Sequence, residues 1–350
     1  MFFIEGQKIT GTSFSNGVQT FLSVSYKHAQ READRNVCPA FSRFLINRSS
    51  LQQAHKDILP EIIAEDGPKS AHNFKMPIIR IKQLSDSRVT IYRNLRQTNL
   101  VRQAGHFIAE GWRVVERLLN SPFEVQSLLL SEKRAEALAG QIDTKADLFV
   151  LPQKEASQLI GFPFHDGVLA CAKRLKNPSL GSIINQQADK NPILICCPRI
   201  TAPDNLGSLI RLGASFGVQG ILLGPGSVDP YVRRTIRVSM GTFFNLSIRT
   251  SNNLLSELKE LRQQNRCKII AAEKTSNSQS LCEAIASKAI TNSVDQSPPT
   301  ILLLGNEADG LEEDWLDLAD KILHIPIQTN VDSLNVTHAA AIFLHELTRK

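Results

Sequence analysis

The chain has 350 residues, and its 40 Lys and Arg against 34 Asp and Glu give a net charge of +6. Its composition is that of a globular protein with room for two domains. No apolar run approaches the roughly 20 residues that cross a bilayer, and Glu5 interrupts the apolar start, which disfavours a membrane protein and a secretory signal.

The six cysteines lie at positions 38, 171, 196, 197, 267 and 282, and none forms a CxxC pair. This spacing indicates reduced thiols in a cytoplasmic protein, with neither a disulfide framework nor a zinc site. We therefore expect neither a metal nor a membrane partner.

Residues 1–75 are rich in Ser, Asn and Gln and show no sustained hydrophobic period. We expect disorder there, with one short helix around 51–65. Met76 then begins "MPIIRIKQLSD", a sensible start for a folded chain. Residues 1–75 are either a real extension or the product of a mis-called start, and we favour the second interpretation.

Residues 76–176 are expected to form a small α/β domain, followed by a polar linker at 177–191. The alternation of helices and strands predicts a mainly parallel sheet. The expected helices are 88–103, 112–119 and 133–141, and the expected strands are 106–111, 125–131, 147–152 and 167–174.

Residues 192–350 are expected to form a second α/β domain, with a Ser- and Asn-rich excursion at 274–299 that holds a short helix, 280–289. Three segments here follow strands, where open α/β sheets bind their ligands. The expected strands are 192–200, 220–224, 244–248, 267–273, 300–306 and 321–327, and the helices are 205–217, 230–242, 252–264, 312–319 and 333–349.

The first segment is "TAPDNLGSLIRLGASFG" (201–217), in which Asn205 is a good helix N-cap. Helical side chains lean toward the N-terminus, so Arg211 is expected to reach back toward the loop that holds Asn205. Taken alone, a capped helix with one solvated arginine explains this segment better than a functional site does.

The second segment is "LLLGNEADGLEEDW" (302–315), where an apolar strand runs into Gly305, Asn306, Glu307 and Gly310. Glycines let the backbone approach a ligand closely. The pattern is neither GxGxxG nor a P-loop, which disfavours a dinucleotide or a nucleoside triphosphate. A simple strand-to-helix turn explains it equally well.

The third segment is "HIPIQTNVDSLNVTHAAAIFLHE" (324–346), in which Ser333 is a plausible N-cap for the last helix. Unpaired backbone N–H groups at a helix start suit a carboxylate or a phosphate oxygen. The alternative is an ordinary capped C-terminal helix.

Together, in this order and spacing, the three segments resemble the motifs of the SpoU/TrmH family of RNA ribose 2′-O-methyltransferases, part of the SPOUT superfamily. The resemblance covers roughly 192–350, and "RVSMGTFFNLSI" (237–248) also fits the family pattern. Residues 84–174 look like the family's small N-terminal substrate-binding domain, whereas 1–75 and 274–299 have no counterpart.

The resemblance implies a C-terminal trefoil-knotted methyltransferase domain, a smaller ribosomal-protein-like α/β substrate-binding domain, S-adenosyl-L-methionine as cofactor, and a homodimer. The implied catalytic residues are Asn205, Arg211, Glu307, Ser333 and Asn335. The implied cofactor-binding residues are Leu304, Gly305, Asn306, Gly310, Ile325, Ile327 and Leu334.

Two basic stretches, "YRNLRQTNLVRQ" (92–103) and "YVRRTIR" (231–237), are nearly free of acids and indicate a nucleic-acid partner. The expected RNA contacts are Arg102, Arg233 and Arg234, and the segment around position 95, which is Leu95 beside Arg96. Taken alone, either stretch is explained better by a solvated helix face, and only the two together favour nucleic acid.

The expected reaction is methylation of a ribose 2′-hydroxyl in structured RNA, with large-subunit rRNA favoured over tRNA. A base methyltransferase of the same fold is disfavoured by the Asn205 and Arg211 pair, and a non-catalytic RNA-binding protein is disfavoured by the intact motifs. Arginine is a poor base because its guanidinium holds its proton. Arg211 therefore either acts as the base in an unusual environment or only orients the ribose.

Overall fold

The computed structural model describes residues 78–96, 100–138, 141–142, 144–185, 192–264, 266–287, 290, 298–306, 308–328 and 333–349. The expected helix at 51–65 and the candidate Glu307 lie outside these residues. The described part of the chain belongs to one compact unit, 75–350, so the expected division into domains 76–176 and 192–350 stays a prediction.

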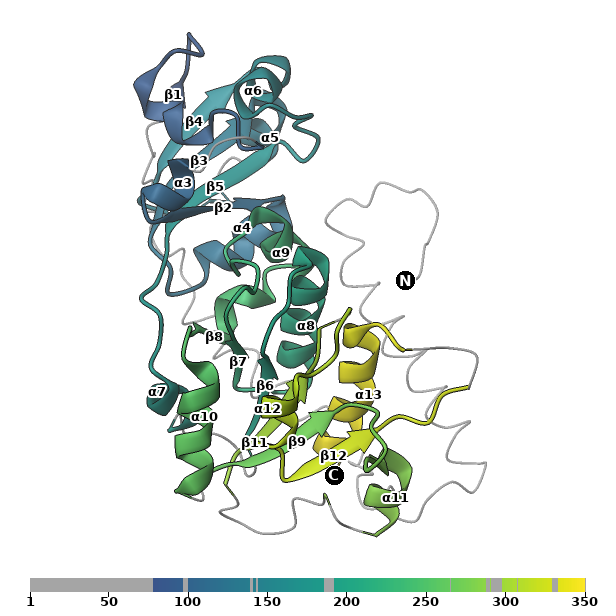
Figure 1. Ribbon diagram of the computed structural model, residues 1–350. Coiled ribbons are helices and arrows are strands. Elements are labelled where there is room, and N and C mark those ends of the chain that lie inside the picture. Colours follow the sequence, from purple (N-terminus) through teal and green to yellow (C-terminus); the bar gives the residue numbers. More distant parts are fainter. Residues whose placement is uncertain are drawn as a thin grey trace, which may run out of the picture. The chain divides into compact units, whose positions relative to one another are not determined.

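The first sheet has five strands in the order β1-β4-β3-β5-β2, drawn in blue and teal in Figure 1. They are β1 (Ile78–Arg80), β2 (His106–Glu110), β3 (Val125–Ser131), β4 (Asp147–Leu151) and β5 (Val168–Lys173). β4 runs parallel to β1 and β3, but β5 runs antiparallel to β2 and β3. The expected mainly parallel sheet is therefore confirmed only in part: β1, β2, β3 and β4 share one direction, and β5 alone runs against them.

The helices of this part agree only partly with the predicted ones. α4 (Trp112–Leu119) matches, α5 (Glu132–Ala137) is shorter, and α6 (Gln153–Ile160) was missed. The expected helix 88–103 is wrong: it is a 3₁₀ turn, η2 (Ser87–Tyr92), followed after a gap by the single turn α3 (Leu100–Gln103). Tyr92 is fully buried and its hydroxyl donates to the Ser127 carbonyl at 2.9 Å, so core packing overrides the helical pattern here.

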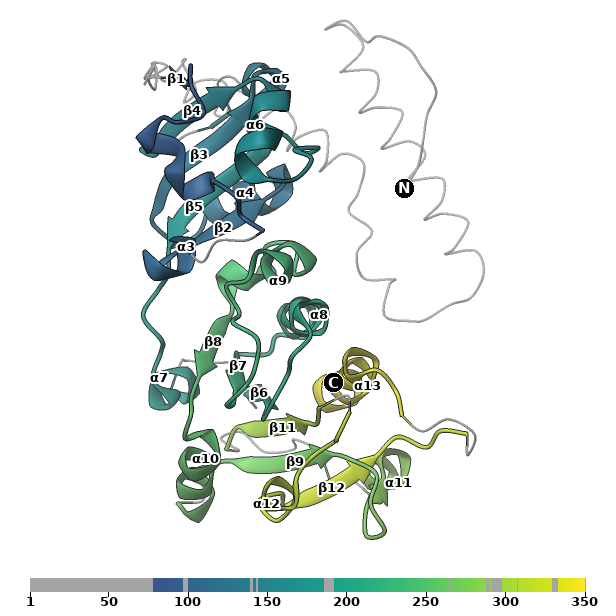
Figure 2. The same ribbon diagram turned by 45° about the horizontal axis from the view of Figure 1, so that its top comes forward.

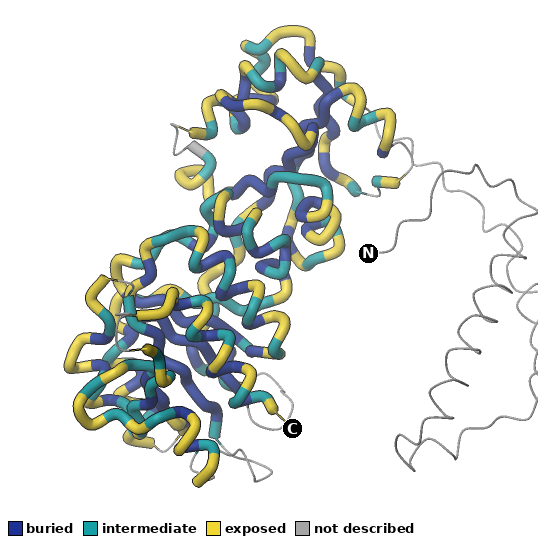
Figure 3. Tube along the Cα trace, turned by 90° about the vertical axis from the view of Figure 1, so that its right-hand side faces the viewer, coloured by how far each residue is buried: buried dark blue, intermediate teal, exposed yellow. Residues whose placement is uncertain are grey.

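The second sheet has seven strands in the order β10-β12-β9-β11-β6-β7-β8, and every neighbouring pair is parallel. They are β6 (Ile193–Cys197), β7 (Gly220–Leu223), β8 (Ser247–Thr250), β9 (Lys268–Ala272), β10 (Gln279–Ser280), β11 (Thr300–Leu304) and β12 (Lys321–His324). β6, β7 and β11 are buried along their whole length, which explains their continuous apolar sequences (Figure 3). β8 starts later than predicted because Thr242–Asn245 forms the 3₁₀ turn η3, which buries two phenylalanines.

Helices cover both faces of this sheet, as Figure 2 shows. Along β6, Ile193, Ile195 and Cys197 face one core, whereas Leu194 and Cys196 face the other. The first core is covered by α8 (Pro203–Ser215), α9 (Arg233–Val238), α11 (Leu281–Ala286) and α13 (Val336–Thr348), and the second by α7 (Leu180–Ile184), α10 (Leu254–Gln263) and α12 (Glu313–Leu316). The α/β architecture is thus confirmed.

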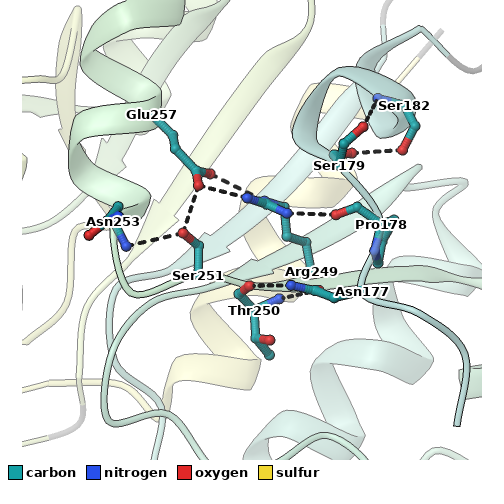
Figure 4. Close-up of polar contacts among 9 residues, drawn as sticks. All are labelled: Asn177, Pro178, Ser179, Ser182, Arg249, Thr250, Ser251, Asn253 and Glu257. Atoms are coloured by element: carbon teal, nitrogen blue, oxygen red, sulfur yellow. Dashed lines mark hydrogen bonds and ion pairs between the residues drawn. The ribbon is translucent and has the colours of Figure 1, made fainter.

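The segment predicted as a linker contains α7, and its first two residues are hydrogen-bonded to β8 (Figure 4). Asn177 donates its side-chain amide to the Thr250 carbonyl at 2.7 Å and accepts from the Thr250 N–H at 3.0 Å. Arg249 donates to the Pro178 carbonyl at 2.7 Å and pairs with Glu257 at 2.6 Å. Side-chain pairing thus fixes the beginning of this segment against the second sheet.

Candidate active site

A cavity of about 390 Å³ lies at the carboxyl ends of β9, β11 and β12. Three segments far apart in the sequence form it: the residues after β9, the loop after β11, and the chain from β12 into α13. All seven residues predicted to bind the cofactor line it, namely Leu304, Gly305, Asn306, Gly310, Ile325, Ile327 and Leu334, and Ser333 lines it too.

The loop after β11 is closed into a tight ring. Asn306 N donates to the Gly310 carbonyl at 3.0 Å, and Gly310 N donates to the Asn306 carbonyl at 2.9 Å. A Cβ on Gly305 would lie 2.6 Å from the Gly310 carbonyl carbon, and Gly310 has a φ of +69°. Both glycines are therefore required by the loop geometry.

Glu273 and Lys274 also line the cavity, and the sequence analysis missed both. Glu273 Oε2 accepts from Leu311 N at 3.0 Å, which ties the end of the loop to the end of β9. The signal was available, because Glu273 is an acidic residue directly after an apolar strand at the sheet edge where ligands bind.

Asn335, not Ser333, is the N-cap of α13, which corrects the expected cap. Its Oδ1 accepts from Thr337 N at 2.8 Å and from Thr337 Oγ1 at 2.6 Å. The remaining donor of the amide, Nδ2, donates to Asn205 Oδ1 at 3.2 Å. One side chain therefore begins the last helix and joins the third motif to the first.

The first motif lies on α8, which starts earlier than predicted. Ala202 occupies the N-cap position and Pro203 the first turn, so Asn205 is inside the helix and does not cap it. The Arg211 carbonyl accepts from Ser215 Oγ at 2.9 Å, but its exposed guanidinium does not line the cavity and forms no hydrogen bond or ion pair with another described residue. The described contacts thus join Asn205 to Asn335 and include no hydrogen bond between Arg211 and Asn205.

The predicted RNA-binding arginines are partly engaged in ion pairs. Arg102 lies 3.5 Å from Asp229, Arg234 lies 2.8 Å from Asp204, and Arg233 pairs with Glu110. The predicted RNA contact at position 95 is wrong, because this residue is Leu95, which packs against the core of the first sheet.

The described cysteines are free, and all but Cys282 are buried. Burial raises the pKa of Cys171 to about 12 and that of Cys267 to about 11, so neither thiol is a ready nucleophile. Among the described residues no group of three His, Cys, Asp or Glu side chains could hold a metal ion. None of the described helices is long and apolar enough to cross a membrane.

Comparison with known proteins identifies the family of this chain. Residues 192–345 match the model of the SpoU rRNA Methylase family. An uncharacterized tRNA/rRNA methyltransferase of Mycobacterium bovis is 30% identical over 269 residues, which cover 75% of this chain and 89% of the relative. The chain belongs to the SpoU family of RNA methyltransferases.

Two further proteins named as rRNA methyltransferases match over most of their length. The 23S rRNA (guanosine(2553)-2′-O)-methyltransferase RlmP of Bacillus subtilis is 22% identical, covering 77% of this chain and 98% of that protein. The crystal structure of an AdoMet-bound rRNA methyltransferase from Sinorhizobium meliloti has a TM-score of 0.63 at 22% identity, covering 78% of this chain and 98% of that chain. The structural likeness shows that the fold is shared.

Proposed function

We propose that this SpoU-family chain transfers a methyl group from S-adenosyl-L-methionine to a ribose 2′-hydroxyl of RNA, with large-subunit rRNA as the favoured substrate. The observation that carries the proposal is the convergence of the second and third motifs on the 390 Å³ cavity, together with the contact between Asn335 and Asn205. The 2′-O-methyltransferase name of the Bacillus relative and the AdoMet-bound Sinorhizobium structure support this choice.

The cavity fits the proposed cofactor. Leu304, Ile325, Ile327 and Leu334 supply apolar contacts for an adenine ring, and Gly305 and Gly310 let the loop backbone approach the ligand closely. Asp309 lines the cavity and offers a carboxylate to a cationic cofactor. When bound, S-adenosyl-L-methionine supplies an electrophilic methyl group on a sulfonium sulfur.

The residues of the chain have to align the ribose and favour loss of its hydroxyl proton. Asn205 and Asn335 are joined by a hydrogen bond at the N-terminus of α13, and they orient the ribose toward the methyl group of the cofactor. Arg211 stabilises the negative charge that develops on the 2′-oxygen, while water or an RNA phosphate accepts the proton, because a guanidinium keeps its own. Ser333 and Glu307 belong to the same proposed constellation.

We also propose the trefoil knot and the homodimer. Ala340, Phe343 and Leu347 of α13 are buried in the core, whereas Ile342 is 40% exposed and gives the helix an outward apolar contact. α13 packs on α8, so we expect pairing of two chains across these helices to bring the exposed Arg211 near the donor cavity of the partner. Such pairing would explain why Arg211 does not line the cavity of its own chain.

The test pairs calorimetric binding of S-adenosyl-L-methionine with single-turnover methylation of transcribed rRNA fragments, with tRNA transcripts as the competing substrate. Arg211→Ala should leave cofactor affinity nearly unchanged and slow transfer by about 10²–10⁴-fold. Arg211→Lys should also be slow, because it lacks the planar fork. Transfer at the wild-type rate by Arg211→Ala would contradict the mechanism, and RNA binding without any transfer would favour a non-catalytic protein.

A further inference from the structure

A second hollow of about 960 Å³ lies apart from the donor cavity, between α9, the start of α4 and the loop 161–167. We refer to it as the arginine groove, because six arginines line it against the two carboxylates of Glu110 and Asp166. They are Arg96, Arg113, Arg134, Arg233, Arg234 and Arg237. The surplus of positive charge indicates an anionic ligand.

The carboxylates neutralise only part of this charge. Glu110 is nearly buried, with a side chain 12% exposed, and pairs with both Arg233 and Arg237. Arg134 donates its Nε to the Asp166 carbonyl at 2.9 Å. Arg96 and Arg113 are exposed, and their side chains form no hydrogen bond or ion pair within the described part of the chain. Two guanidinium groups are therefore free to bind phosphate in a bidentate manner.

The groove also presents flat surfaces. The guanidinium carbon of Arg233 lies 4.0 Å from the ring centroid of Phe162, and that of Arg96 lies 5.8 Å from it. Trp112 lines the same groove and is partly exposed. Guanidinium planes and aromatic rings are the surfaces on which proteins stack unpaired RNA bases.

The groove is connected to the active site through short contacts. Arg234 pairs with Asp204 at 2.8 Å, and Asp204 directly precedes Asn205, which Asn335 contacts at 3.2 Å. α9 also crosses α8 closely, because a Cβ on Gly207 would lie 2.7 Å from the Thr235 carbonyl oxygen. A strand held in the groove thus lies next to the first motif.

We propose that the arginine groove binds an unpaired stretch of the substrate RNA, with phosphates on Arg96 and Arg113 and a base stacked on Trp112 or on the Arg233 guanidinium. This inference rests on the proposed function, since it specifies the form of RNA that the enzyme takes. Duplex RNA fits poorly, because its base faces are stacked inside the helix and cannot reach these surfaces.

The first test measures binding of a fluorescein-labelled single-stranded oligoribonucleotide across a salt series. Arg113→Ala and Arg96→Ala should each weaken binding about tenfold and lower the salt slope by about 0.7, the single-strand value. Arg266→Ala is the matched control, because Arg266 is also exposed and lies outside the groove. Cofactor affinity should stay at the wild-type value in all three variants.

The second test uses tryptophan fluorescence, since the chain contains only Trp112 and the buried Trp315. The oligonucleotide should quench the emission, and Trp112→Phe should abolish the quenching while keeping most of the affinity. Equal competition by duplex RNA of the same length, or equal binding by Arg113→Ala and Arg266→Ala, would overturn the proposal. If these binding results hold but wild-type protein transfers no methyl group, the groove stands and the proposed function fails.

Discussion

Replacing Gly305 by alanine tests whether the closed loop after β11 is required for cofactor binding. The new Cβ would lie 2.6 Å from the carbonyl carbon of Gly310 and 2.9 Å from both its Cα and its oxygen. All three are backbone atoms, so no side-chain rotation relieves the overlap. The loop has to open and stretch the two hydrogen bonds between Asn306 and Gly310.

The cost follows from these contacts. Overpacking costs about 1–3 kcal/mol, and each of the two lost hydrogen bonds adds about 1 kcal/mol, so a total of about 3–5 kcal/mol is expected. Domains have about 5–15 kcal/mol of stability, so the variant should still fold. Since 1.4 kcal/mol corresponds to a factor of about ten in affinity, binding of S-adenosyl-L-methionine should fall at least tenfold.

The assay combines urea unfolding with calorimetric titration of the cofactor. Gly181→Ala is the control, because a Cβ there meets no atom within 4 Å and α7 lies at the other core of the sheet. It should change stability by about 1 kcal/mol or less and leave binding unchanged. If Gly305→Ala unfolds and binds cofactor like the wild type, the requirement for a closed glycine loop is refuted.

Four further outcomes are expected. Asn335→Asp keeps an acceptor for Thr337 but loses the donor to Asn205, so it should slow methyl transfer with little loss of thermal stability, whereas Asn335→Ala should also lose about 0.5–2 kcal/mol from the cap. Burial raises the pKa of Glu257, but the hydrogen bonds from Arg249 and Ser251 outweigh the effect of burial and lower the pKa overall. Glu257→Gln should therefore reduce the free energy of unfolding at pH 7. Urea titrations should show that this loss shrinks below about pH 4.3, where the carboxylate of the wild type becomes protonated. Ile342→Glu should give monomers in sedimentation velocity and lose activity, and an active monomer would argue against the homodimer. A chain that starts at Met76 should fold and methylate RNA normally, and loss of solubility on this truncation would show that residues 1–75 are structural.

The sequence predicted the second sheet well because its strands are buried on both faces. Continuous apolar runs such as Ile193–Cys197 and Thr300–Leu304 have few alternatives to a parallel strand with helices on either side. The three segments that contain the cavity residues followed from the same logic, since ligands of such sheets bind where the strands end, but the individual cofactor-binding residues came from the family resemblance. Local sequence was thus sufficient wherever burial and strand order determine the site together.

Tertiary contacts decided the features that were predicted wrongly. The pattern at 88–103 suggested a helix, but burial of Tyr92 against Ser127 holds the segment in a 3₁₀ turn. Ser333 and Asn335 are both good N-caps by residue type. The residue that caps α13 is Asn335, which also contacts Asn205, 130 residues earlier in the chain. The role of Glu273 depends on Leu311, in another strand's loop. The position of Glu273 after an apolar strand was visible in the sequence, but its partner Leu311 and the other two pairings were not.

The cavity includes residues from the C-terminal end of the chain, which the ribosome synthesises last. β6, β7, β8 and α8 emerge from the ribosome early, but the donor cavity also needs Leu334, Val336 and Phe343. A nascent chain can therefore fold its first sheet and half of its second before it can bind any methyl donor. We therefore expect no methyl transfer by a nascent chain before α13 has taken its place in the core.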